Sequence, residues 1–197
     1  MLVCCERFKL KTWHIYRRAT FVYRQHNDID WRKLVSISGI SVYMKEQLIE
    51  AWQINNRMNL LLIDNIDDAG MQKTLSTRGG RTIYLQLVHV HNVRIGWLEV
   101  IAKDIYSKYK QLDKDATYNR TALRKAFEES AKGIEEFINQ SWEKGGIVKS
   151  FKKGLVPMIA YFISHESHHR GQALLTLKQS GVKIPDILKW GLWEWGK

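Results

Sequence analysis

Apolar residues recur at intervals of three and four in four segments, and polar connections separate these segments. The first segment begins at Met44 and ends near Ile66, where acidic residues and a glycine follow. The third covers residues 123–142 and carries charged residues on its opposite face. The fourth begins at Pro157, which suits the first turn of a helix, and ends at residues 179–181. Each pattern predicts an amphipathic helix.

The second segment, residues 83–106, allows two interpretations. Apolar and polar residues alternate over residues 85–92, which is typical of a strand. The apolar character then continues without a turn signal to a total of about 24 residues, far longer than an ordinary strand. A helix that begins after Thr82, a residue suited to capping, is therefore favoured. Four helices of about 20 to 25 residues predict an all-α fold, a four-helix bundle whose long connections permit crossovers.

Residues 1–43 differ from the rest of the chain. They are basic and aromatic, lack helical periodicity and hold both cysteines, Cys4 and Cys5. The composition changes abruptly at Met44, where the first helical pattern begins. We therefore expect a bundle domain of residues 44–197, with Met44 as the initiator and residues 1–43 as an upstream extension outside the fold.

The formal net charge of +11 raises the question of nucleic-acid binding. After Met44, however, lysines and arginines are scattered among acids, which favours solvated helix faces over a nucleic-acid surface. No apolar run approaches the roughly 18 residues that cross a bilayer. Since the cysteines are confined to the N-terminal stretch, these features together predict a cytoplasmic protein that does not bind membranes, and they disfavour nucleic-acid binding.

Five of the seven histidines gather in the second and fourth predicted helices. His165 and His169 are one turn apart and can chelate one ion, although His168 also lies one turn from His165. His89 and His91 point about 200° apart on a helix, so only one of them can face that ion. Three neutral nitrogen ligands suit Zn²⁺, Ni²⁺, Fe²⁺, Co²⁺ or Mn²⁺ and leave coordination positions open, as a catalytic site requires.

Residues 165–169 also match H-E-x-x-H, the pattern of zinc peptidases. One peptidase class needs a third, acidic ligand from a further helix, and the only acids beyond this motif are Asp186 and Glu194. The metzincin class needs glycine and histidine where this chain has Gln172 and Leu175. The context argues against a peptidase, and we expect no metal-dependent peptide hydrolysis.

Three segments of residues 44–197 together resemble the DinB/YfiT-like family of metalloenzymes. Residues 1–43 lie outside the resemblance, in agreement with a start at Met44. The combination is specific, whereas any one segment alone is a weak signal. The matching segments are residues 79–94, which resemble the family's second helix, residues 165–181, which begin with its last-helix signature HESHHRGQ, and the tail, residues 184–197.

The resemblance implies an up-down-down-up four-helix bundle, often dimeric, with one divalent metal ion held by three histidines. Carried over to this chain, the ligands are His89, His165 and His169, and the additional His91 departs from the commoner family pattern. Relatives with assigned activities include thiol-dependent S-transferases and a maleylpyruvate isomerase. The family name refers to damage-inducible expression and does not imply DNA binding.

These family properties lead to a functional expectation. The chain would be a metal-dependent transferase of the thiol S-transferase type, or a hydrolase, in which a metal-bound thiol or water is activated to attack a small molecule. A low-molecular-weight thiol would serve as the cosubstrate, and the assembly would be a homodimer.

Two further residues are candidates for catalytic roles. Glu166, between the metal ligands, is the nearest base in the sequence, although it lies about 100° from His165 on the helix. Arg170 either binds an anionic group of the substrate or pairs with an acid inside the bundle. Two other classes of function stay open: a non-catalytic metal-binding stress-response protein, and a basic module that binds nucleic acid.

Overall fold

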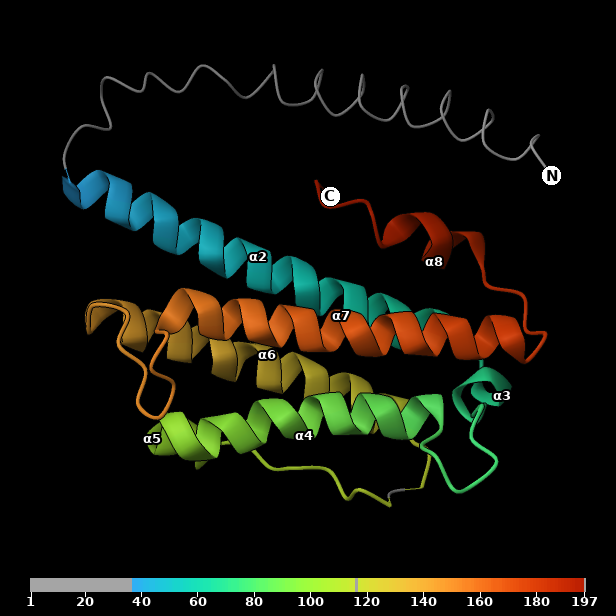
Figure 1. Ribbon diagram of the computed structural model, residues 1–197. Coiled ribbons are helices and arrows are strands. Elements are labelled where there is room, and N and C mark those ends of the chain that lie inside the picture. Colours follow the sequence, from blue (N-terminus) through green and yellow to red (C-terminus); the bar gives the residue numbers. More distant parts are fainter. Residues whose placement is uncertain (1–36, 116, 197) are drawn as a thin grey trace. The chain divides into compact units, whose positions relative to one another are not determined.

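The computed structural model describes residues 37–115 and 117–196, and all of its regular elements are helices (Figure 1). Contacts set residues Lys45–Lys197 apart as one compact unit, and this unit contains every candidate site residue. The prediction of an all-α fold is confirmed. The strand interpretation of residues 85–92 is wrong, because these residues lie within one long helix.

Four long helices account for most of this unit, although the first of them begins before Lys45, and three short helices connect or follow them. Figure 1 shows α2 and α7 running in one direction and α4 and α6 in the other, which is the order of directions in an up-down-down-up bundle. The long helices are α2 (Ile37–Asn65), α4 (Ile83–Ile101), α6 (Arg120–Glu143) and α7 (Leu155–Gln179). The short helices are α3 (Asp68–Met71), α5 (Lys103–Tyr106) and α8 (Asp186–Gly191).

The helix ends agree with the sequence signals at some positions and depart from them at others. Thr82 caps α4 as expected, since its hydroxyl oxygen accepts a hydrogen bond from the Leu85 amide at 3.2 Å. The predicted helix over residues 83–106 is interrupted at Ala102, whose extended φ of −152° separates α4 from α5. Buried Ile105 continues the apolar spacing past this break, so the pattern alone does not reveal it.

Helix α2 begins before the position at which the sequence pattern begins. It starts at Ile37 and continues through Met44 without interruption. No proline lies within Ile37–Asn65, so the backbone can remain helical across Met44.

The core consists of two apolar clusters, one toward each end of the bundle. The first is centred on Leu62, Leu87, Phe127 and Leu177, and the second on Trp52, Leu98, Ile138 and Phe162. Along each long helix, a stretch of buried polar residues separates the positions that belong to the two clusters. This middle layer contains Asn55, Asn56 and Asn59 from α2, Arg94 from α4, Ser130 from α6, and Glu166 and Arg170 from α7.

The C-terminal tail packs against α2. Leu188 of α8 is fully buried, and a side-chain carbon at Gly191 would lie 2.8 Å from Leu61, so the two segments approach closely. The Arg57 guanidinium donates a 3.4 Å hydrogen bond to the Trp195 carbonyl oxygen. The tail is therefore part of the folded unit. No helix in the described part of the chain is both long and apolar enough to cross a membrane.

Two glycines inside long helices provide a matched test of this packing. At Gly133 of α6, an added Cβ would lie 2.8 Å from Tyr109 and 3.2 Å from Leu98, whereas at Gly171 of α7 it would meet no atom within 4 Å. We expect Gly171→Ala to raise the free energy of unfolding by up to about 1 kcal/mol through helix propensity. Gly133→Ala gains the same propensity but overpacks the contact, at a cost of about 1–3 kcal/mol.

Urea unfolding followed by circular dichroism measures both variants against the parent protein. Equal free energies of unfolding for Gly133→Ala and Gly171→Ala would show that α6 does not pack closely against Tyr109.

Candidate metal centre

Three histidine side chains converge at the level of the polar layer. His89 comes from α4, and His165 and His169 come from successive turns of α7. The ring centroids are 5.4 Å apart for His89–His165, 5.1 Å for His89–His169 and 4.6 Å for His165–His169. Each residue offers a ring nitrogen within 4.8 Å of the other two, so the group could hold one metal ion.

The surroundings of these rings favour the neutral imidazole that a metal ion requires. Partial burial, followed by the neighbouring histidines, lowers the pKa of His169 to about 4. Partial burial also lowers the pKa of His165. It lowers the pKa of His89 as well, and the nearby positive charge of Arg81 lowers that pKa further. All three rings are therefore largely unprotonated at neutral pH, with lone pairs available for coordination.

Two buried nitrogen atoms give independent support for a bound ion. Within the described part of the chain, Nδ1 of His165 and Nδ1 of His169 are buried without a hydrogen-bond partner, a property that Nδ1 of His91 and Oε1 of Gln86 share outside the group. Buried polar atoms in native proteins nearly always have a partner, because leaving one without a partner costs free energy. The donor set, its neutrality and these unpaired atoms together fit a divalent metal ion.

The other two clustered histidines lie outside the group of three. His91 is buried on a different face of α4, where its Nε2 lies 3.0 Å from the Lys110 carbonyl oxygen and its ring packs beside Phe127. His168 is exposed and contacts only the edge of His169 among the ligand candidates. The geometry therefore selects His89 over His91, and metal binding through the three grouped histidines stays a prediction.

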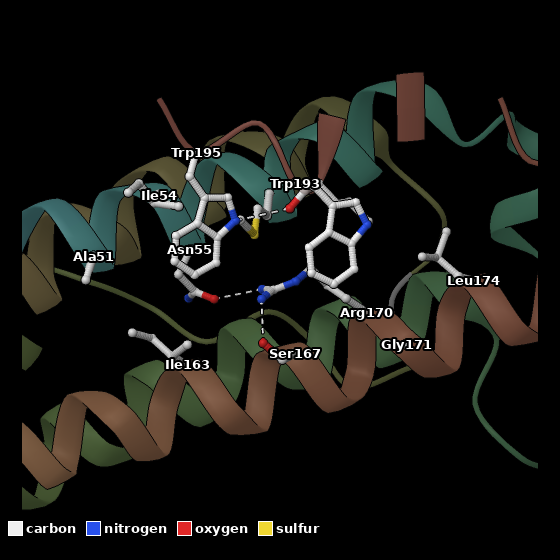
Figure 2. A pocket seen from close by; sticks show the side chains of 12 residues that line it. Ala51, Ile54, Asn55, Ile163, Ser167, Arg170, Gly171, Leu174, Trp193 and Trp195 are labelled. Atoms are coloured by element: carbon white, nitrogen blue, oxygen red, sulfur yellow. Dashed lines mark hydrogen bonds between the residues drawn. The ribbon is translucent and has the colours of Figure 1, made fainter. Parts of the chain in front are cut away.

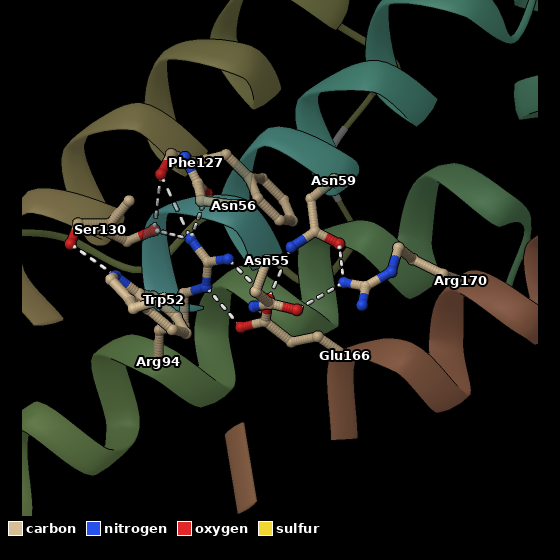
Figure 3. Close-up of polar contacts among 10 residues, drawn as sticks. Trp52, Asn55, Asn56, Asn59, Arg94, Phe127, Ser130, Glu166 and Arg170 are labelled. Atoms are coloured by element: carbon tan, nitrogen blue, oxygen red, sulfur yellow. Dashed lines mark hydrogen bonds and ion pairs between the residues drawn. The ribbon is translucent and has the colours of Figure 1, made fainter. Parts of the chain in front are cut away.

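Glu166 points into the bundle interior, where it forms a buried ion pair with Arg94 (Figure 3). Nε and Nη2 of Arg94 each donate to one carboxylate oxygen at 2.7 Å. Asn55 and Asn59 add amide hydrogen bonds to Oε2 at 2.7 and 2.6 Å. The Glu166 side chain is 1% exposed, and both of its carboxylate oxygens accept hydrogen bonds. This geometry gives Glu166 a structural role and does not support a role as catalytic base.

The remaining donors of Arg94 connect the pair to α2 and α6. Nη1 donates to Asn56 Oδ1 at 2.9 Å, to Ser130 Oγ at 3.2 Å and to the Phe127 carbonyl oxygen at 3.3 Å. The guanidinium lies between the rings of Trp52 and Phe127, 4.6 and 4.7 Å from their centroids. The Arg94–Glu166 pair therefore links all four long helices.

Arg170, the other predicted catalytic residue, also belongs to the interior. Its Nη1 donates to Asn55 Oδ1 at 2.8 Å and to Asn59 Oδ1 at 2.9 Å, and its Nη2 donates to Ser167 Oγ at 2.7 Å. Burial lowers the pKa of the guanidinium from its usual value. The side chain lines a cavity between α7, α2 and the tail, and it does not line either hollow beside the histidines.

The family model of the DinB family matches residues 40–191, which is well over half of the chain. The chain belongs to the DinB family. Among solved structures, it is similar to a DinB-like protein from Bacillus cereus ATCC 10987, with a TM-score of 0.56 and 15% identity over 71% of this chain and 95% of the other. At that identity the similarity supports the fold alone, and a comparison with curated proteins gave no match.

In this DinB family member, two hollows flank the histidines. The first, of about 440 Å³, is mainly apolar: His89 lies at its edge, Trp97 and Tyr161 supply aromatic walls, and Gly96 leaves space. The second, of about 420 Å³, has more polar groups in its wall: His169 adjoins Arg81, Gln86 and Gln172. An ion held by the histidines would therefore be accessible from both an aromatic and a polar side.

The partners of Glu166 were missed at the sequence level. Arg94 lies in the most apolar helix, and the three asparagines lie within or beside the apolar stripe of α2. A charged or amide side chain at a position that periodicity assigns to the core is a signal for a buried polar network. That signal was present, but the sequence does not show which residues on other helices meet there.

The buried pair can be compared with an exposed one. We expect Arg94→Met to lower the free energy of unfolding by about 3–5 kcal/mol, because Glu166 would keep a buried charge without its main partner. Arg124→Met removes two exposed pairs, with Asp64 and Glu128, whose side chains are 40% and 43% exposed, and it should change the free energy of unfolding by about 1 kcal/mol or less. Urea denaturation of the three proteins at one pH gives both values. Equal losses in the two variants would contradict the buried network.

Proposed function

We propose that this protein is a divalent-metal-dependent enzyme that acts on a small molecule, most simply as a thiol S-transferase or a hydrolase. The observation that carries the proposal is the group of three neutral, half-buried imidazoles that opens onto two hollows of different polarity. Structural metal sites are usually closed by four protein ligands, whereas three ligands and an accessible face are typical of catalytic sites.

A divalent ion bound there would supply Lewis acidity, which lowers the pKa of a coordinated thiol or water toward neutrality. Every other part of the proposed reaction depends on the protein's own residues. Burial, the largest cause in each case, lowers the pKa of His89, His165 and His169, so near pH 7 a metal ion competes little with protons for their ring nitrogens.

The aromatic hollow is suited to an apolar, electrophilic substrate. Trp97 and Tyr161 contact each other edge to face, with ring centroids 5.8 Å apart, and Tyr161 stacks on His165 at 6.1 Å and 20°. These contacts hold His165 in place and present ring faces to a ligand. Asn92 exchanges two 2.8 Å hydrogen bonds with the Leu112 backbone, which fixes the wall where α4 meets the following connection.

The polar hollow is suited to the second reactant. Arg81 contributes a positive charge close enough to His89 to affect its pKa, and Gln86 and Gln172 contribute amide groups. A low-molecular-weight thiol with an acidic group would bind there with its sulfur toward the histidines. A homodimeric assembly, which the family resemblance implies, and a cytoplasmic location, which the composition indicates, accompany this proposal.

Glu166 has a positioning role in this proposal. It follows His165 directly, and its ion pair with Arg94 joins α7 to α4, the helix that carries His89. A rigid connection between these helices keeps the three ring nitrogens close enough to share one ion.

The ligand set is tested with five single alanine variants. We expect the full-length protein to bind about one divalent ion per chain, and the variants at His89, His165 and His169 to lose it, since removal of one ligand from three cuts affinity severely. His91→Ala and His168→Ala should retain the ion. Metal content by mass spectrometry, with helical circular dichroism as a folding control, gives the result. Retention by all five variants would overturn the three-histidine site, and loss in His91→Ala with retention in His89→Ala would invert the choice on α4.

Turnover is tested with low-molecular-weight thiols against epoxides and chlorinated aromatics. We expect metal-dependent product formation that His169→Ala abolishes. Gly96→Leu should keep the ion but lower kcat/KM for bulky electrophiles, because it fills the aromatic hollow, whereas Gly96→Ala should be close to the parent, since its Cβ would meet only the Gln111 amide at 3.8 Å. Full metal occupancy with no turnover of thiol, ester or amide substrates would instead support a non-catalytic metal-binding protein.

A further inference from the structure

A third cavity lies on another side of α7, between α7, α2 and the tail that follows α8 (Figure 2). Its volume is about 380 Å³, which lies within the range of small-molecule sites. It shares no lining residue with the two hollows beside the histidines. Most of its wall is apolar, formed chiefly by Ile54, Met58, Ile163, Leu174, Trp193 and Trp195.

The polar part of the wall is small and charged. Arg170, Ser167 and Asn55 lie together on one side, as Figure 2 shows, and no acidic residue of the described chain lines the cavity. Arg170 is 7% exposed, and its three hydrogen bonds go to Asn55, Asn59 and Ser167. A guanidinium has five N–H donors, so this arrangement leaves donors for a ligand at the cavity wall.

The net charge of the buried polar layer indicates that a ligand in the cavity would be negatively charged. Two guanidinium groups, Arg94 and Arg170, share one carboxylate, Glu166, which leaves one positive charge in excess. Arg94 takes both oxygens of Glu166 directly. Arg170 reaches the carboxylate only through Asn55 and Asn59, whose amide groups donate to Glu166 while their oxygens accept from Arg170. The uncompensated charge therefore lies at Arg170, beside the cavity.

An anion in the cavity would offset the cost of burying that charge. A carboxylate can accept from the remaining guanidinium donors, while the apolar wall requires that the rest of the ligand be aliphatic or aromatic. The indole rings of Trp193 and Trp195 add flat aromatic faces, and the tail that carries them is fixed by buried Leu188 and by the Arg57 hydrogen bond.

We propose that this cavity is a second ligand site, separate from the histidine group, which binds a small apolar or aromatic molecule through one carboxylate held by Arg170. The site depends on α2, α7 and the tail, and it does not depend on a bound metal ion.

The test uses the full chain, from which metal has been removed with a chelator. The two probes, 6-phenylhexanoate and 6-phenylhexan-1-ol, share the same hydrocarbon skeleton and differ only in the polar end group. We expect the carboxylate to bind one molecule per chain in calorimetry, with a change in tryptophan fluorescence, and at least about tenfold more tightly than the alcohol. Equal dissociation constants for the two probes would overturn the role of Arg170.

Two variants at one position test the location. Gly171 lines the cavity, and an added Cβ there meets no atom within 4 Å, so Gly171→Phe can fill the space without disturbing α7. We expect Gly171→Phe to weaken 6-phenylhexanoate binding at least about tenfold, and Gly171→Ala to leave it within about twofold. Arg170→Gln should abolish the preference for the carboxylate over the alcohol.

Two further experiments distinguish this site from the metal centre and from an interface between two copies of the chain. His89→Ala, which removes a proposed metal ligand on α4, should bind 6-phenylhexanoate as the parent does. Unchanged binding in Gly171→Phe would place the ligand elsewhere and overturn the proposal. A dimer in sedimentation equilibrium that Gly171→Phe dissociates would also overturn it, because the cavity would then be covered by a second copy.

Discussion

The buried ion pair between Arg94 and Glu166 is the interaction on which the arrangement of this bundle depends. A carboxylate 1% exposed and a guanidinium that is fully buried are stable inside a protein only when both are hydrogen-bonded on all sides. Here the partners come from every long helix: asparagines of α2, Ser130 and a carbonyl oxygen of α6, and the pair itself from α4 and α7. The four helices must therefore keep one register, because a shift of either member would leave a buried charge without partners.

This register also determines what each side of α7 can do. Successive residues on a helix point about 100° apart, so His165 and His169 share a side while Glu166 turns inward. Ser167, Arg170 and Gly171 turn toward the cavity under the tail. The sequence H-E-x-x-H therefore has a different meaning here from its meaning in a peptidase. The histidines form part of the candidate metal centre with α4, and the glutamate stabilises the bundle at the same level.

The sequence predicted the all-α fold because apolar spacing reports helices directly, and the regular stripe over residues 123–142 lies within α6. It predicted the grouping of His165 and His169 because their spacing alone brings them together on one turn. The choice of His89 came from family resemblance, since spacing alone left His89 and His91 as alternatives. The break at Ala102 was missed because buried Ile105 continues the apolar pattern beyond it. The partnership of Arg94 with Glu166 was missed because the two residues are 72 positions apart, and local periodicity cannot report which distant charges meet.

Crystallography of the metal-loaded full-length protein, with anomalous diffraction at the absorption edge of the ion, tests the central claim most directly. The account predicts one anomalous peak between α4 and α7, about 2.0–2.1 Å from one ring nitrogen each of His89, His165 and His169 if the ion is zinc, with the Glu166 carboxylate still paired to Arg94. A peak coordinated by Glu166 or by His91, or a well-ordered histidine group with no ion after saturating load, would contradict it.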